Sequence, residues 1–208
     1  MTRLIDIVAA ACGLAVTSPL FVVVAAAVAA TSPGPVFFRQ QRIGRGFRPF
    51  TLYKFRTMVA GAERGAPITA GGDRRVTRVG RWLRKTKLDE LPQLVNVLKG
   101  DMSLVGPRPE VPRFVEMFRA DFEEILTVRP GITDFASLEY RHEEEALAGF
   151  EDPEAGYVAV VLPHKIALCR RYLRERGVFT DLRIVALTLA ALLRPPHGGG
   201  IPVSRKTK

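Results

Sequence analysis

Two adjacent carboxylates, Asp89 and Glu90, are the residues of this sequence with the clearest capacity for chemistry. They lie in the stretch TKLDELPQL, directly after a segment rich in arginine and lysine. Three interpretations compete: the start of a helix, a metal site, or a nucleophile with an acidic partner. An ionised carboxylate beside cations that neutralise phosphate is a competent nucleophile toward phosphorus.

The residues after this acidic pair predict a helix. Four apolar residues recur at the spacing of one helical face: Leu91, Leu94, Val95 and Leu98. Pro92 is tolerated only in a first turn, so Asp89 is expected at or next to the N-cap and Glu90 in the first turn. Acids at these positions cap amide donors and suit the helix dipole. A helix start also attracts phosphate, so the structural and the catalytic interpretations both remain open.

Basic residues precede the acidic pair. Arg84, Lys85 and Lys87 are expected to hold both carboxylates ionised. Because consecutive helical residues diverge by about 100° around the axis, the two acids cannot do identical work.

The composition favours an anionic partner. The chain has 208 residues, enough for one domain with its own core, and carries 31 Lys and Arg against 21 Asp and Glu, a net charge of +10. Nucleic acid, an anionic membrane surface and phosphorylated substrates all fit this charge. The two cysteines, Cys12 and Cys169, have neither disulfide-framework nor zinc spacing, which favours a reducing compartment.

The N-terminal stretch from Leu4 to Ala30 is almost entirely apolar and long enough to enter a bilayer. A cleaved signal peptide is disfavoured, because Arg3 is the only basic residue ahead of the run and the run exceeds a usual signal core. Ser18-Pro19 lies in its middle, where the proline removes a backbone donor and predicts a kink or break. The hydroxyls of Thr17 and Ser18 can satisfy the carbonyls that are released.

Basic residues flank both ends of this apolar run. Arg3 lies before it, and four arginines follow it: Arg39, Arg42, Arg45 and Arg48. Positive charge at both ends favours a segment that dips into the membrane and returns to the cytoplasmic side. Periodicity alone leaves this re-entrant arrangement and a spanning helix equally open.

The segment from Arg39 to Lys87 is strongly basic. Its first part alternates bulky and basic residues, which indicates short strands or surface loops, and Ala60 to Asp73 is expected to be a mobile loop. The stretch RRVTRVGRWLRKTK then predicts a basic helix with Trp82 and Leu83 on its apolar face. This helix either covers a core with a solvated charged face or lies against lipid headgroups.

The stretch KGDMSLVGPRPE places Arg108 between Pro107 and Pro109. Two rigid prolines can hold the guanidinium in place for bidentate phosphate recognition, whereas the alternative is an ordinary turn with a surface arginine.

The C-terminal third predicts further helices. Phe114, Phe118, Phe122 and Ile125 share one face and are expected in the core. The run Glu143 to Glu145 is expected to be a solvated face, and no partner is identified for His164. Phe179–Leu193 is apolar but too short to span, with Thr180 as its expected N-cap, and can be buried or interfacial.

The combination of SPGPVFFRQQRIG, YKFRTM, the long block around Asp89 and RPGIT resembles the bacterial sugar transferases, the monotopic phosphoglycosyl transferases. The resemblance runs from the N-terminal apolar segment to about Asp181. It implies transfer of a phosphosugar from a UDP-sugar donor to a polyprenol phosphate, most naturally undecaprenyl phosphate, with release of UMP through a covalent aspartyl-phosphosugar intermediate. This is the first membrane step of glycoconjugate or exopolysaccharide assembly.

The resemblance also implies an architecture. It is a mostly helical α/β fold with a re-entrant membrane helix over residues 1–32, broken at Ser18-Pro19. A compact catalytic domain over residues 33–194, with interfacial amphipathic helices, follows at the cytosolic face of the inner (cytoplasmic) membrane. Residues 195–208 are expected to be a flexible tail. The chain is similar to the minimal catalytic form, without the additional transmembrane bundle of longer relatives.

Site residues follow from the resemblance position by position. Asp89 corresponds to the nucleophile and to a Mg²⁺ ligand, and Glu90 to its acidic partner. Four basic residues fall where phosphate or uridine contacts are expected: Lys54, Arg56, Arg84 and Arg108. Two features depart from the pattern. Lys87 replaces a small hydroxyl residue, and RPGITDFASLEY departs from the commoner PGITG, which puts the local geometry beyond Thr133 in question.

Two other classes fit the charge. A membrane-tethered nucleic-acid binder is disfavoured because the basic segment contains no known recognition module, so no nucleic-acid partner is expected. A non-catalytic scaffold is the second. Both predict that a chain changed at Asp89 keeps its whole activity.

Overall fold

The computed structural model describes residues 3–62 and 68–193 and is mostly helical, as the sequence predicted. The predicted tail therefore lies outside the described residues, as does the middle of the predicted loop. The elements in chain order are α1 (Arg3–Thr31), β1 (Phe37–Ile43), η1 (Arg45–Phe47), β2 (Pro49–Phe55), α2 (Arg78–Thr86), η3 (Leu88–Glu90), α3 (Gln93–Lys99), β3 (Ser103–Val105), α4 (Pro112–Met117), α5 (Arg119–Ile125), β4 (Gly131–Thr133), α6 (Phe135–Glu139), α7 (Glu143–Leu147), α8 (Pro153–Gly156), η4 (Tyr157–Val161), α9 (Leu162–Glu175) and α10 (Val178–Leu193).

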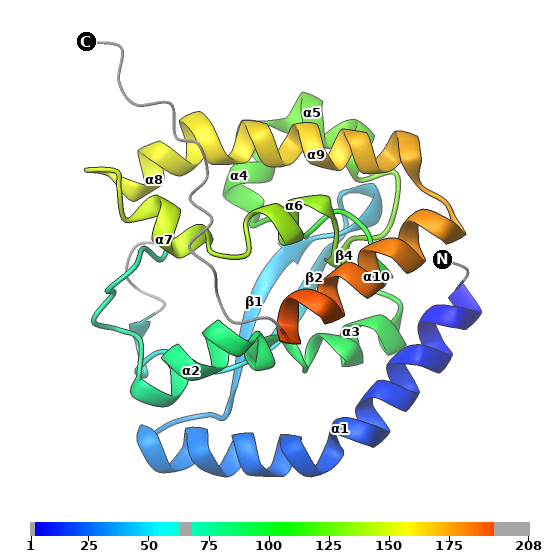
Figure 1. Ribbon diagram of the computed structural model, residues 1–208. Coiled ribbons are helices and arrows are strands. Elements are labelled where there is room, and N and C mark those ends of the chain that lie inside the picture. The colour runs from blue at the N-terminus through cyan, green and yellow to red at the C-terminus, as the bar shows by residue number, and fades with distance from the viewer. Residues whose placement is uncertain (1–2, 63–67, 194–208) are drawn as a thin grey trace.

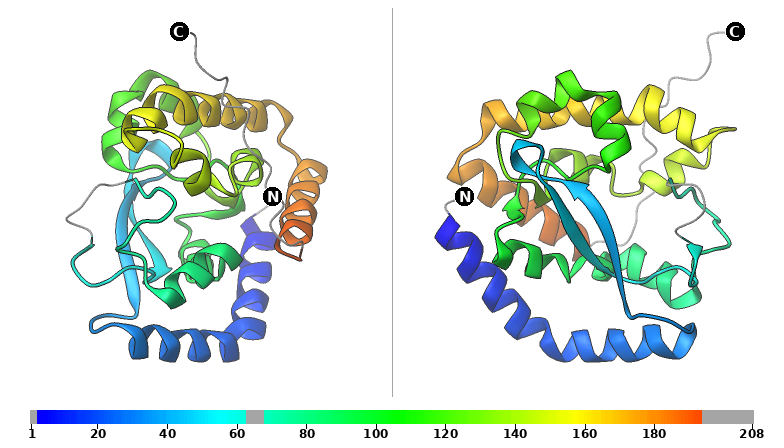
Figure 2. Two further views of the ribbon diagram at one scale, coloured as in Figure 1. Left: turned by 60° about the vertical axis from the view of Figure 1, so that its left-hand side comes forward. Right: turned by 180° about the vertical axis from the view of Figure 1, so that it is seen from behind.

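The basic segment after α1 forms a hairpin, which confirms the prediction of short strands. β1 and β2 pair antiparallel from Phe37 opposite Phe55 to Ile43 opposite Pro49. In the turn between them, Gly46 has φ of 66°, a left-handed conformation that glycine adopts at no steric cost. The hairpin crosses the molecule between α1 at one end and the helical layer of α4, α5 and α9 at the other (Figures 1 and 2).

The second sheet joins two motifs that are far apart in the sequence. β3 and β4 pair in parallel, and α4 and α5 form the crossover between them. The pairing needs glycine at position 131, because a Cβ there would lie 2.1 Å from the backbone nitrogen of Gly106. Arg108 and the RPGIT stretch are thereby brought to one place.

α1 runs without interruption through Pro19 and bends in its middle, as the two views show (Figure 2). Pro19 cannot donate to the carbonyl of Ala15, and the hydroxyl of Ser18 donates to that carbonyl instead, at 2.8 Å. The hydroxyl of Thr17 likewise donates to the carbonyl of Gly13, at 2.7 Å. The expected kink is present. The helix continues there, and the carbonyl of Ala15, which loses its backbone donor at Pro19, is satisfied by the hydroxyl of Ser18.

The first turns of α1 are bonded to the rest of the molecule. The guanidinium of Arg3 donates to the carbonyls of Val97 and Leu98, at 2.6 and 2.9 Å, and so caps the end of α3. The buried carboxylate of Asp6 accepts from the hydroxyl of Ser103, at 2.8 Å, and from the amide of Leu104, at 3.1 Å.

The other end of α1 is bonded to the same domain. Val24 and Val28 are buried in a cluster with Phe55 and Leu83. Arg56, at the end of the hairpin, donates to the carbonyls of Ser32 and Pro33, at 2.6 and 3.0 Å. Both ends of α1 therefore lie against one folded unit.

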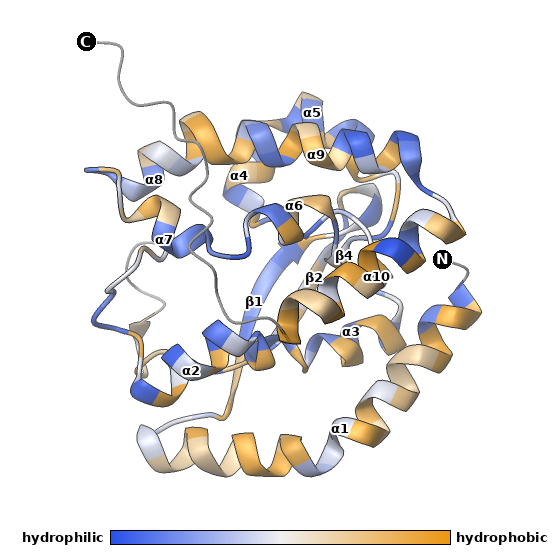
Figure 3. Cartoon of the chain, in the orientation of Figure 1, coloured by the Kyte–Doolittle hydropathy of each residue, from blue (hydrophilic) through white to orange (hydrophobic). Residues whose placement is uncertain are grey.

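The outer surface of α1 is apolar. Among the described residues it is the one helix long and apolar enough to cross a membrane, and only 11% of its most apolar window is buried, so it is not a core helix. Seven of its large apolar side chains are exposed: Leu4, Ile5, Ile7, Val8, Val16, Val22 and Val23. α10 is similar, because Asp181 and Ile184 are buried while Phe179 and Leu193 are 89% and 87% exposed. Figure 3 shows the apolar character of both helices.

The core of the helical layer contains the predicted aromatic face. Phe114, Phe122 and Ile125 are buried there with Tyr157 and residues of α9. The predicted single helix is interrupted at Phe118, whose φ of −116° separates α4 from α5.

Several predictions about the helices were wrong. The basic helix α2 begins only at Arg78, because Val76 pairs with Met58 in a β-bridge. Thr180 lies inside α10 and does not cap it. His164, for which the sequence identified no partner, is a partly exposed histidine whose Nδ1 lies 2.6 Å from the hydroxyl of Tyr140.

Candidate active site

The acidic pair lies in a short 3-10 turn between α2 and α3. Lys87 ends α2 in the left-handed conformation, with φ of 58°, and turns the chain into η3. Pro92, and not Asp89, is the N-cap of α3, so the predicted capping role is wrong. The proline fixes a φ of −60° at that position, and Asp89 belongs to the separate turn before it.

The polar side of α3 holds this turn on the hairpin. Asn96 is fully buried, donates to the carbonyl of Thr51 at 2.7 Å and accepts from the amide of Tyr53 at 3.1 Å. Val95 and Leu98, whose spacing predicted the helix, are each 37% exposed.

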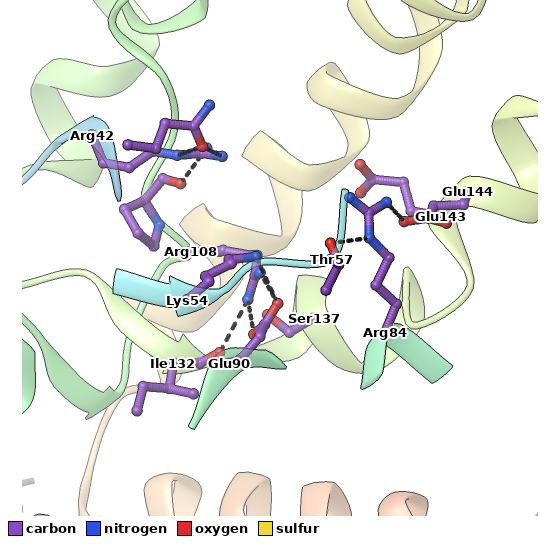
Figure 4. A network of polar contacts seen from close by, with 12 residues as sticks. Arg42, Lys54, Thr57, Arg84, Glu90, Arg108, Ile132, Ser137, Glu143 and Glu144 are labelled. Carbon is purple, nitrogen blue, oxygen red and sulfur yellow. Dashed lines mark hydrogen bonds and ion pairs between the residues drawn. The ribbon is translucent and has the colours of Figure 1, made fainter. Parts of the chain in front are cut away.

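Glu90 is the centre of an ion-pair network (Figure 4). Its Oε1 accepts from Lys54 Nζ at 3.0 Å and also from Arg108, whose second guanidinium nitrogen reaches Oε2 at 2.9 Å. Arg108 thus makes the bidentate contact expected of a guanidinium with a carboxylate. It also donates to the carbonyl of Ile132, at 3.4 Å.

Asp89 has a different environment. It is only 6% exposed, and among the described residues its buried Oδ1 has no hydrogen-bond partner. A buried carboxylate oxygen without a donor is costly unless a ligand, an ion or a reacting group uses it.

The two acids differ in electrostatics. Burial raises the pKa of Glu90, but the charges of Arg108 and Lys54 outweigh this and hold the pKa well below its ordinary value. Burial raises the pKa of Asp89, and the charge of Lys54 offsets only part of the increase. The sequence named Arg84, Lys85 and Lys87 as the cations that hold both acids ionised, whereas the two cations in contact are Lys54 and Arg108, and both pair with Glu90.

Two of the predicted substrate-binding arginines pair elsewhere in this structure. Arg84 donates to the hydroxyl of Thr57, at 2.8 Å, and to Glu144, at 2.6 Å. Arg56 is engaged with the end of α1. The structure thus brings together Asp89, Glu90, Lys54 and Arg108, while a role of Arg56 and Arg84 toward substrate stays a prediction.

The acidic pair opens into a cavity of about 1830 Å³. On its far side, Glu143 pairs with Lys165 at 2.7 Å, and Glu110 pairs with Arg42 at 3.0 Å. The hydroxyl of Tyr157 joins these pairs by donating to Glu110, at 2.5 Å. The prediction of a solvated acidic face was therefore wrong for Glu143, whereas Glu144 binds Arg84 with a side chain that is still 43% exposed.

The apolar helix α10 reaches the rim of this cavity. Thr188 and Leu192 line it together with Asp89 and Glu90. The hydroxyl of Thr188 lies 2.7 Å from that of Thr133, at the end of β4. The cavity is therefore bounded both by charged groups and by a helix with an exposed apolar face.

The acidic pair can supply only part of the ligand set for the Mg²⁺ that the resemblance implies. The described residues contain no group of three metal-binding side chains. However, Mg²⁺ is commonly held by one or two carboxylates together with substrate phosphates and water. The unpartnered Oδ1 of Asp89 can supply such a ligand, so the site suits a metal that arrives with a diphosphate.

Comparison with known proteins is consistent with this site. A family model described as bacterial sugar transferase matches residues 1–195. The UDP-N-acetylgalactosamine-undecaprenyl-phosphate N-acetylgalactosaminephosphotransferase of Aeromonas hydrophila is 46% identical over 148 residues, which cover 69% of this chain and 35% of that protein. This chain thus spans about a third of the length of that relative.

Two further relatives are similar over most of this chain. The UDP-glucose:undecaprenyl-phosphate glucose-1-phosphate transferase of Caulobacter vibrioides is 40% identical over 196 residues, 92% of this chain and 69% of the relative. An uncharacterized sugar transferase of Bacillus subtilis is 38% identical over 194 residues, 93% of this chain and 87% of the relative. Because the family model covers nearly the whole chain, including every element that builds the site, this protein belongs to the bacterial sugar transferase family.

Proposed function

We propose that this chain is a phosphoglycosyl transferase that moves a phosphosugar from a UDP-sugar to undecaprenyl phosphate and releases UMP. The observation that carries the proposal is the buried, unpartnered Oδ1 of Asp89 beside the network of Glu90, Arg108 and Lys54. The names of the relatives, which are UDP-sugar:undecaprenyl-phosphate sugar-phosphate transferases, support the substrate classes.

The proposed reaction has two displacements at phosphorus. In the first, an oxygen of Asp89 bonds to the phosphorus that carries the sugar, and the bond from that phosphorus to the bridging oxygen breaks, so UMP leaves with the electron pair. In the second, a phosphate oxygen of the polyprenol phosphate attacks the same phosphorus and the Asp89 carboxylate is released. Each step thereby requires only one substrate in place at a time.

The neighbours of Asp89 suit this chemistry. A diphosphate that approaches two carboxylates is repelled unless cations intervene. Arg108 and Lys54 lie on Glu90 in this structure, and their remaining donors can turn toward phosphate oxygens. Glu90 holds the two cations in place, whereas Asp89 attacks the phosphorus.

Mg²⁺ is expected to be required. When bound by Asp89 and the diphosphate, it would neutralise phosphate charge and polarise the phosphoryl group. We predict that EDTA abolishes UMP release and that excess Mg²⁺ restores it, with Mn²⁺ restoring it in part. Full UMP release in EDTA would contradict a metal requirement.

The activity is expected to fall at low pH because Asp89 becomes protonated. Attack requires the ionised carboxylate, and burial raises its pKa above the ordinary value of about 3.9. The pKa of Glu90 is lower in the folded protein than in the unfolded chain. Its ionised carboxylate therefore stabilises the fold fully above about pH 4.3, and this stabilisation is lost only at lower pH. We therefore expect kcat/KM to fall on acidification before the protein unfolds. Constant kcat/KM down to the unfolding pH would contradict this assignment.

We further propose that α1 is re-entrant. A straight helix of 29 residues is about 43 Å long, enough to place its ends on opposite sides of a hydrocarbon core of about 30 Å. A spanning α1 would have to give up either the contacts of Arg3 and Asp6 or those of Arg56. The bent, re-entrant arrangement keeps both sets and exposes mainly apolar side chains, together with Ser18, whose hydroxyl is bonded to the carbonyl of Ala15.

The topology can be measured with single cysteines. In a Cys12→Ala background, we expect a cysteine added at the N-terminus and one at Pro35 to be labelled only after the cytosolic face is made accessible. Cys169 is buried and serves as an internal control for intact protein. Labelling of the N-terminal cysteine from the periplasm would instead favour a spanning helix.

The domain is proposed to lie at the cytosolic face of the inner membrane, with α10 and α2 at the interface. Phe179 and Leu193 project from α10, and Trp82 of α2 is 52% exposed. Aromatic and apolar residues beside arginines suit the headgroup region.

A direct assay tests the proposed function. Detergent-solubilised protein is combined with undecaprenyl phosphate, Mg²⁺ and a panel of UDP-sugars that includes UDP-glucose and UDP-N-acetylgalactosamine. We expect UMP release with at least one donor, dependent on the lipid. Release of UDP instead of UMP would indicate simple glycosyl transfer and would refute the proposal.

A further inference from the structure

We propose that Asp134 is a positioning residue that holds the backbone of Arg108 and so sets the guanidinium on Glu90. The proposal rests on the proposed function for its kinetic consequence. Its structural basis is independent of that function, because it concerns contacts between Asp134, Arg108 and α6.

Asp134 is a fully buried carboxylate with a donor at each oxygen. Its Oδ1 accepts from the amide and the hydroxyl of Ser137, both at 2.7 Å, and so caps α6. Its Oδ2 accepts from the backbone N–H of Arg108 at 3.4 Å and lies 3.7 Å from the thiol of Cys169. One oxygen therefore caps α6, and the other accepts the hydrogen bond from the backbone of Arg108.

The backbone of Arg108 has few other ways to be fixed. Pro107 and Pro109 carry no N–H, so Arg108 provides the only amide donor of this triplet, and Asp134 accepts it. The carbonyl of Pro107 accepts from Gly131 at 3.0 Å, which places β4 alongside. With the backbone held by Asp134, the guanidinium reaches both oxygens of Glu90.

Asp134 also occupies the position at which this chain departs from the commoner PGITG pattern. A glycine there has no side chain to accept the Arg108 amide or to cap α6. In this chain the aspartate supplies both contacts.

Two variants separate the positioning role from the cap. Asp134→Asn keeps one oxygen for Ser137, and asparagine is as good an N-cap as aspartate. Its amide nitrogen cannot accept the Arg108 N–H, so the contacts of Oδ2 with Arg108 and with the Cys169 thiol are lost while the cap is kept. Ser137→Ala is the matched control, because it removes the hydroxyl donor but keeps the backbone cap and the Arg108 contact.

Hydrogen exchange measures the contact itself. Pro107 and Pro109 have no exchanging amide, so Arg108 gives the only signal between Gly106 and Glu110. We expect Asp134→Asn to accelerate exchange of the Arg108 amide about tenfold or more, while Ser137→Ala leaves it within about twofold of wild type. Unchanged exchange in Asp134→Asn would overturn the proposal whether or not the protein transfers sugar phosphate.

A kinetic cycle tests the consequence for Arg108. We expect Asp134→Asn to lower kcat/KM for the UDP-sugar about tenfold in the wild-type background and less than about twofold in Arg108→Lys. Equal losses in the two backgrounds would show that Asp134 acts on the fold in general, which refutes the positioning role. An absence of UMP release in the wild type would count against the proposed function, and the exchange result would still decide the role of Asp134.

Discussion

Asp89→Asn is expected to abolish UMP release, with a loss of about three orders of magnitude or more in kcat. Asparagine is nearly isosteric with aspartate and fits a site that is 6% exposed, so packing is retained. An amide is a poor nucleophile, however, and cannot form the acyl phosphate that the proposed mechanism requires. The variant should bind donor and insert into membranes as the wild type does.

The control for this substitution is Asp121→Asn. Asp121 lies on the outside of the helical layer, where it pairs with Arg170 at 3.1 Å, away from the acidic pair. We expect nearly unchanged turnover and thermal stability in this variant. Wild-type turnover in Asp89→Asn would show that Asp89 is only a structural residue of the turn.

Arg108→Ala is expected to have the second-largest effect, on both stability and activity. It leaves Glu90 nearly buried with Lys54 as its remaining ionic partner. Removal of one member of a buried ion pair costs about 3–5 kcal/mol, and because Arg108 is partly exposed we expect about 2–3 kcal/mol in the free energy of unfolding. The proposed phosphate contact is lost as well, so kcat should fall about 100-fold or more.

Chemical denaturation and UMP release measure these two effects separately. Arg113→Ala is the matched control, because Arg113 forms a surface pair with Glu154 and is 60% exposed. It should change the free energy of unfolding by less than about 1 kcal/mol. Equal effects of Arg108→Ala and Arg113→Ala would show that the bidentate contact with Glu90 contributes little.

The central part of the site could be predicted because its determinants are local in sequence. Asp89 and Glu90 are adjacent, and Arg108 is marked by the two prolines that flank it. Their convergence could not be read from spacing, because it depends on the parallel pairing of β3 with β4 and on the hairpin that carries Lys54.

The ion pairs of Glu143 and Glu144 in the cavity wall were not predicted, for a related reason. Glu144 pairs with Arg84, which is 60 residues away, and Glu143 pairs with Lys165, which is 22 residues away. An acidic run carries no local sign of such partners, so a solvated face was the natural expectation. A tertiary contact of this kind only becomes visible once α7 is placed against α2 and α9.

Apolar periodicity predicted a helix after the acidic pair, but it did not show which side of that helix is buried. The structure buries Gln93 and Asn96 of α3 and leaves Val95 and Leu98 each 37% exposed. Asn96 is buried because its side chain is bonded to the hairpin at Thr51 and Tyr53, and a local pattern cannot reveal such contacts.

The path of α1 was likewise undecided from sequence. Length, hydropathy and Pro19 suit both a spanning and a re-entrant helix. The proposal of a re-entrant helix rests on where Arg3, Asp6 and Arg56 find their partners, and these contacts all join residues more than 20 positions apart in the chain.

Exchange of labelled UMP into UDP-sugar, with no lipid acceptor present, tests the central claim most directly. If Asp89 forms a covalent phosphosugar and releases UMP before the acceptor binds, the reverse of that half-reaction must return label to the donor. We expect exchange in the wild type and in Asp121→Asn, none in Asp89→Asn, and a phosphosugar mass on the peptide that contains Asp89. Lipid-dependent UMP release without any exchange in the wild type would contradict the covalent mechanism and favour direct transfer in a single step.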